Sequence, residues 1–217
     1  MNKLLMKLHY LAWLLTAVVL LLAFIAWGQG FSWQFGSLGT YQLFPIFGLA
    51  AFSTMWVQYI VRAVKEPLDL HSPALSNYFH LTSWLVVVAI LLHPGLLSWQ
   101  LWRDGLGLPP GSELMYVGPM LHVAVIIGMT ALFIFLAFEL HYIFKKYRWW
   151  RYMAYVQDAA MLGIFYHALR LGTQTRFGWF QKLWWFYGIT LVLALGYIYT
   201  AHFLGKRRKI PVSSAKA

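Results

Sequence analysis

The chain has 217 residues, of which 61% are hydrophobic, 19% aromatic and 11% charged, with a formal net charge of +11. This balance excludes an ordinary water-soluble domain and indicates an integral membrane protein. Because the sequence contains no cysteine, it also excludes disulfides, thiolate metal sites, iron–sulfur clusters and covalently attached c-type heme.

Six apolar segments are each long enough to cross a membrane as a helix, since about 20 residues span a hydrocarbon core of about 30 Å. The segments are residues 8–27, 39–62, 77–99, 116–144, 152–171 and 183–204. The first begins like a signal peptide, but no small-residue cleavage pattern follows, so we interpret it as a retained helix. The sequence thus predicts one membrane domain over residues 1–217, an all-α bundle of six transmembrane helices with a cytoplasmic tail at 205–217.

The basic residues predict the orientation of this bundle. With the N-terminus in the cytoplasm, all but four of the 17 lysines and arginines lie on the cytoplasmic side, the four being Arg103, Arg170, Arg176 and Lys182. This asymmetry follows the positive-inside rule and predicts that both termini are cytoplasmic in a multi-pass protein of the cell's inner membrane. The positive charge is then a signal of topology and of contact with anionic membrane lipid, and nucleic-acid binding is not predicted.

Histidines at matched depths in the third and fifth segments are candidate cofactor ligands. His93 and His167 fall in the outer half of two segments that run in the same direction, so their rings can face each other. His80 lies thirteen residues before His93, or roughly 20 Å toward the cytoplasm at about 1.5 Å per helical residue. The residue thirteen before His167 is Ala154, which has no donor atom. Paired imidazoles inside a membrane indicate heme ligation, and hydrogen bonding between helices is the simpler alternative.

Other polar residues have two interpretations each. Arg170, one turn beyond His167, is a candidate partner for a heme propionate or an arginine that extends to the interface. His122 is predicted to donate a hydrogen bond near the heme, for instance to a propionate, and axial ligation is its alternative. Asp158 lies well inside its segment, where it can neutralise His80 or form a polar cavity. Ala154 cannot act as a ligand opposite His80. Other residues near the cytoplasmic side that can take this role are Met153, His9, His71, His141 and His202.

Two short motifs resemble those of a known family. They are HLTSW through LH in residues 80–93, and WRYMA through YH in residues 150–167. Both resemble the ferric reductase-like transmembrane domain family, whose relatives include the NADPH oxidase membrane domain, the metalloreductases and the heme-binding subunit of periplasmic methionine sulfoxide reductase. The resemblance covers roughly residues 40–204 and implies two stacked b hemes, each held by a histidine pair. Ala154 departs from the family's histidine.

We therefore expect one heme b with its iron held by His93 and His167, and a second heme at His80 is the alternative. The chain has no Gly-x-Gly-x-x-Gly motif, so neither a flavin nor a nucleotide site is predicted. Electrons must then come from a separate flavoprotein, from quinol or from another membrane subunit. They would pass to an outer-face acceptor, as in the membrane component of a reductase. The competing interpretation is a cofactor-free proton or ion transporter, or a membrane scaffold.

Overall fold

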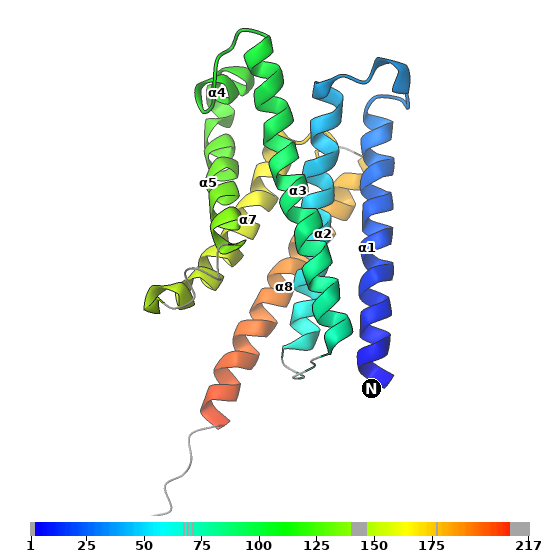
Figure 1. The fold of residues 1–217 in the computed structure, drawn as a ribbon, viewed down its shortest axis with the longest axis vertical. Helices are drawn as coiled ribbons and strands as arrows, with labels where there is room; N and C mark the ends of the chain where they lie inside the picture. The colour runs from blue at the N-terminus through cyan, green and yellow to red at the C-terminus, as the bar shows by residue number, and fades with distance from the viewer. Residues whose placement is uncertain are drawn as a thin grey trace, which may run out of the picture.

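The computed structural model describes residues 3–66, 68, 70, 72–139, 147–176 and 178–208, and every regular element among them is a helix (Figure 1). The long helices are α1 (Lys3–Gly30), α2 (Thr40–Lys65), α3 (Pro73–Arg103), α5 (His122–Glu139), α7 (Met153–Leu171) and α8 (Gly178–Arg208). Short helical segments lie between them, namely η1 (Phe35–Ser37), α4 (Gly111–Val117), η2 (Pro119–Leu121) and η3 (Arg148–Tyr152). The predicted all-α class is confirmed.

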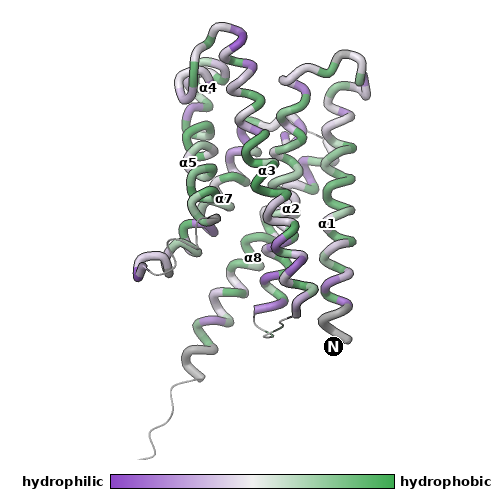
Figure 2. Tube along the Cα trace, in the orientation of Figure 1, coloured by the Kyte–Doolittle hydropathy of each residue, from purple (hydrophilic) through white to green (hydrophobic). Residues whose placement is uncertain are grey.

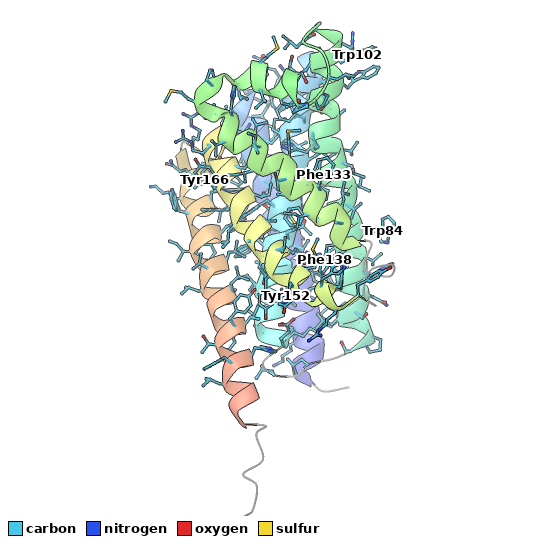
Figure 3. All side chains as sticks on the ribbon, turned by 90° about the vertical axis from the view of Figure 1, so that its left-hand side faces the viewer. Trp84, Trp102, Phe133, Phe138, Tyr152 and Tyr166 are labelled. Carbon is cyan, nitrogen blue, oxygen red and sulfur yellow. The ribbon has the colours of Figure 1, made fainter. Side chains whose placement is uncertain are left out.

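The helices have the length and surface of membrane spans. Among the described residues, five stretches are long and apolar enough to cross a membrane: Lys7–Gly30, Thr40–Lys65, Pro73–Arg103, Pro119–Phe138 and Gly178–Leu204. Hydrophobic residues follow the middle of these helices, and hydrophilic residues gather toward their ends (Figure 2). Large apolar side chains also point away from the bundle, among them Trp84 and Phe133, which are 60% and 67% exposed (Figure 3). These features are those of a membrane protein.

The fifth predicted span, residues 152–171, corresponds to α7, which is not among these five apolar stretches. This helix has 19 residues, enough for about 28 Å at 1.5 Å per residue. Its sequence, however, includes Gln157, Asp158 and Arg170, which lower its mean hydropathy. A six-span count therefore stays a prediction.

The long helices run between two ends of the molecule. Helix α1 begins and α8 finishes at the same end in Figure 1, which we call the terminal end. The connection between α1 and α2, together with α4, lies at the opposite end, which we call the loop end. The predicted tail is partly helical, because α8 extends to Arg208. The rest of that tail lies outside the described residues.

The fourth predicted segment, residues 116–144, is interrupted near its start. Its first residues belong to α4, and the chain then turns at Gly118, whose φ is +76°. Glycine adopts this left-handed conformation without a Cβ penalty, and Pro119 cannot donate the amide hydrogen that would continue α4. The long apolar helix α5 therefore begins only at His122. Residues 140–144 of the predicted segment lie outside the described part.

The bundle is built from two helical pairs. Helix α2 packs along α3, and α5 packs along α7, whereas the two pairs make few close backbone contacts with each other. Helix α1 packs on α2 and α3, and α8 packs mainly on α2. Local bonds support this arrangement: Ser72 caps α3 by accepting from the Leu75 amide, and Trp27 Nε1 of α1 donates to the Gln42 carbonyl of α2.

Candidate functional site

His93 on α3 is oriented by the neighbouring helix α2. Its Nδ1 lies 2.9 Å from the carbonyl oxygen of Phe44. Because a carbonyl only accepts, Nδ1 must carry the ring proton and donate it, which leaves Nε2 with a free lone pair. The ring lies over Gly48, where an added Cβ would come within 2.8 Å of the imidazole. Glycine at this position is therefore what lets the ring reach the carbonyl.

His167 on α7 repeats this arrangement against α5. Its Nδ1 lies 2.8 Å from the carbonyl oxygen of Ala124. The ring covers Gly128, where an added Cβ would lie 2.4 Å from Nδ1. His167 Nδ1 is again the donor, and Nε2 keeps its lone pair. Each helical pair thus carries one imidazole in the same tautomer.

In both helical pairs, the glycine beneath the imidazole ring lies four residues after the residue whose carbonyl accepts the hydrogen bond. In α2 the accepting carbonyl belongs to Phe44 and the glycine is Gly48, and in α5 they belong to Ala124 and Gly128. Residues four apart lie above one another on a helix face. The glycine thus removes the side chain that would cover the carbonyl one turn away, and an imidazole from the paired helix fills that space.

The two imidazoles belong to different helical pairs, and His167 is one of the groups that act electrostatically on His93. Within the described part of the chain, neither Nε2 has a hydrogen-bond partner. A neutral imidazole nitrogen with a free lone pair is a common ligand of iron, and a backbone hydrogen bond to the other nitrogen fixes the ring orientation. Such nitrogens are the type of donor that can hold the iron of a b heme.

His80 and Ala154 are not brought together. The His80 side chain is exposed on α3, whereas Ala154 lines a cavity in the terminal half of the bundle. Arg170 is exposed near the loop end of α7. His122 Nε2 lies 3.0 Å from the Leu114 carbonyl, so this ring links α5 to α4.

The other candidate inner ligands are spread over the structure. His9 contacts Tyr10 and Trp13 edge to face within α1, and His202 is exposed near the terminal end of α8. Met153 is half-buried at the first residue of α7. His71 and His141 lie outside the described residues. Among the described residues, no group of three or more histidine or acidic side chains is placed to hold a free metal ion.

The cavity beside Ala154 has a volume of about 350 Å³ and lies between the two helical pairs. Its apolar lining comes from Met55, Phe79, Val86, Val87, Ile90, Phe135, Phe138 and Ala154. Its polar lining comes from Gln58, Tyr59, Arg62, Glu66, Ser83 and Gln157. Figure 3 labels Phe138 on the part of α5 nearest the terminal end.

Asp158 is the buried centre of a polar network next to this cavity. Its side chain is 5% exposed and accepts hydrogen bonds from Tyr59 (2.8 Å), from Arg62 Nη1 (3.2 Å) and from Tyr199. These partners come from α2 and α8, and His80 is not one of them. Arg62 also pairs with Glu66 at 2.8 Å. A buried carboxylate needs such compensation, so Asp158 holds α7 to α2 and α8.

Glu113 is a second buried carboxylate, and its position in the loop between α3 and α5 gave no sign of burial. It is 8% exposed in α4 and accepts from Ser98 (2.6 Å) and Ser112 (2.9 Å). The sequence reasoning also missed Gly48 and Gly128. The signal that could have found them is a glycine in an apolar helix. It stands four residues after a position that faces a histidine of the neighbouring helix.

Comparison with protein-family models, with curated proteins and with solved structures finds no match to this chain.

Proposed function

We propose that this chain is a heme b-binding electron-transfer protein of the membrane, with His93 and His167 as the axial ligands. The observation that carries the proposal is the pair of matched imidazoles on two helical pairs. Each ring has Nδ1 bonded to a backbone carbonyl and Nε2 free. Two such nitrogens are the ligand set of a low-spin b heme, and the resemblance of residues 80–93 and 150–167 to ferric reductase-like domains points the same way.

The chain's own residues would orient and hold the group. A b heme bound here would supply a reversible one-electron iron couple. His93 and His167 would occupy both axial positions, which favours electron transfer at the heme edge over binding of oxygen. Gly48 and Gly128 keep the space in which the rings lie, and the Phe44 and Ala124 carbonyls keep each ring from rotating. Arg170 is the proposed propionate partner.

The direction of transfer follows from the proposed topology. If the basic terminal end is cytoplasmic, electrons enter from a cytoplasmic flavoprotein or from quinol and leave at the loop end to an outer-face acceptor. The protein would then be the membrane component of a reductase in the inner membrane. The geometry favours one heme over two, because His80 is exposed and Ala154 offers no donor.

The test is an absorption spectrum of purified protein with its histidine variants. We expect a Soret band that shifts on reduction by dithionite, and about one heme per chain by pyridine hemochrome. His93→Ala and His167→Ala should each remove most of this heme because one strong axial ligand is lost, while membrane insertion persists. His202→Ala is the matched control and should keep the wild-type spectrum, since His202 is exposed near the end of α8.

Two results would contradict the proposal. Colourless protein would favour the cofactor-free transporter or scaffold. A normal low-spin spectrum in either His93→Ala or His167→Ala would show that another pair holds the iron. We expect His80→Ala to keep the wild-type heme content, and loss of a second heme in that variant would revive the two-heme arrangement.

A further inference from the structure

The cavity between the two helical pairs has the size and the surroundings of a ligand site. Its volume of about 350 Å³ lies in the range of about 300–1,000 Å³ that small-molecule pockets occupy. Its walls come from four helices, α2, α3, α5 and α7, and α3 and α5 make few close backbone contacts with each other. The helices beside it carry exposed apolar side chains such as Trp84 and Phe133. In a membrane such side chains face lipid, so we expect a molecule dissolved in the bilayer to reach the cavity from the side.

The lining combines an apolar surface with several hydrogen-bond donors. Aromatic and branched side chains, among them Phe79, Val87 and Phe138, form the apolar part. Amide and hydroxyl groups of Gln58, Ser83 and Gln157 supply neutral donors. Gln58 Nε2 donates one of its two hydrogens to Thr82 Oγ1 at 2.9 Å, which leaves the second for a ligand. Such a mixture suits a flat apolar ring that carries hydrogen-bond acceptors.

The cation of the cavity lining is already compensated by carboxylates. Among the described residues that line the cavity, Arg62 is the cation, and it is paired with Glu66 at 2.8 Å and with Asp158 at 3.2 Å. Lys65 Nζ lies 5.0 Å over the ring of the lining residue Phe79, so two cations and two carboxylates balance formally around the cavity. No cation of the lining is therefore left to pair with a phospholipid phosphate, a flavin phosphate or a heme propionate, and a neutral ligand is favoured.

The lining also lacks the ligands that a second heme needs. Of the described residues that line the cavity, none is a histidine, and Met55 is the one with a sulfur donor. A six-coordinate b heme takes two axial ligands, commonly imidazoles. The exposed side chain of His80 does not line this space.

We propose that this cavity binds the head ring of a lipid-soluble quinone. The ring is neutral and flat, its carbonyl oxygens accept hydrogen bonds from Gln58, Ser83 and Gln157, and its isoprenoid tail lies in the bilayer. Binding of the quinone needs no heme, whereas the role of its reduced form, the quinol, as the electron donor rests on the proposed function. The site occupies the position where the family resemblance implies an inner heme.

Two matched pairs of variants test the cavity. Ala154→Phe fills it from α7, and Ala159→Phe adds the same ring at an exposed position of the same helix. Val87→Trp fills it from α3, and Val88→Trp adds an indole at a position that is 50% exposed. The second pair keeps the test decisive if one filling variant fails to fold.

The measurement is titration of the purified full-length protein with decylubiquinone, a short-tailed quinone, with heme per chain determined separately. We expect one equivalent to bind to the wild type and to both exposed-position controls, and binding at least tenfold weaker in both filling variants. Absence of binding by folded wild-type protein, or equal binding by filling variants and controls, would overturn the proposal.

A separate outcome identifies a different occupant. If the wild type holds two hemes and a filling variant loses one, the cavity is a heme site and the quinone proposal is wrong. If the wild type binds quinone but shows no Soret band, the quinone site stands and the proposed function fails. The quinone proposal is therefore tested by quinone binding, and the proposed function is tested by the heme spectrum.

Discussion

At the scale of single residues, the site depends on two glycines as much as on two histidines. Gly128 and Gly48 lie directly beneath the imidazole rings of His167 and His93. The backbone carbonyls that they uncover fix the tautomer of both rings. A small substitution at either glycine should therefore move the imidazole ring above it, although the histidine itself is unchanged.

We expect Gly128→Ala to displace the His167 ring, because the new Cβ would lie 2.4 Å from Nδ1. The variant should lose most of its heme and unfold more easily by about 1–3 kcal/mol, the usual cost of overpacking. Heme per chain and thermal unfolding in detergent measure the two effects. Gly196→Ala is the control, because nothing lies within 4 Å of its added Cβ. Equal heme content in both variants would argue against the role of Gly128 in positioning His167.

The Asp158 network allows a second prediction at this scale. Asp158→Ala should destabilise the protein by about 3 kcal/mol, the low end of the cost of breaking a buried ion pair. The low end applies because Arg62 keeps Glu66 and its side chain is 28% exposed. Thermal unfolding measures the loss, and Val156→Ala, at a position of the same helix that is 41% exposed, is the control. Similar stability of the two variants would show that Asp158 does not hold α7 in place.

The sequence identified the two histidines but not what surrounds them. His93 and His167 stand out because an imidazole in an apolar segment is costly and needs a partner. Phe44 and Ala124 could not stand out, since every residue carries the carbonyl that these two contribute. The partners of Asp158 were equally hidden, because Tyr59, Arg62 and Tyr199 come from helices far apart in the sequence.

At the scale of helices, apolar segments predicted where helices lie but not where each begins and ends. Helices α2 and α3 extend beyond residues 39–62 and 77–99 at one or both ends. An apolar run marks only the part in the hydrocarbon, whereas the helix continues into polar residues until a cap or turn stops it. The break at Gly118 escaped notice because the residues on either side of it are apolar.

The contact between α4 and α5 can be tested through His122. His122→Ala should remove the bond to the Leu114 carbonyl and destabilise α4 by about 0.5–1.5 kcal/mol, the net value of one hydrogen bond. Amide hydrogen exchange should be faster in α4, while heme content stays at the wild-type level. Loss of heme in this variant would instead favour the predicted hydrogen bond between His122 and the cofactor.

At the scale of the whole molecule, the predicted orientation in the membrane can be tested by chemical labelling of lysines. Lys182 is the lysine predicted on the outer side, and all the others are predicted on the cytoplasmic side. A membrane-impermeant amine reagent added to intact cells should therefore label one lysine, because Lys182 is exposed near the loop end of α8. Peptide mapping locates the label, and permeabilised cells show that the other lysines react. Labelling of Lys65 in intact cells would reverse the topology.

The division of the bundle into two helical pairs also bears on how the protein is made. The α2–α3 pair contains the Phe44 carbonyl, Gly48 and His93, and the α5–α7 pair contains a complete second set. Each half can orient its imidazole as soon as its own two helices have entered the bilayer. Capture of the proposed heme can then follow synthesis and insertion. On that proposal, cells starved of heme should accumulate an inserted precursor that matures when heme returns.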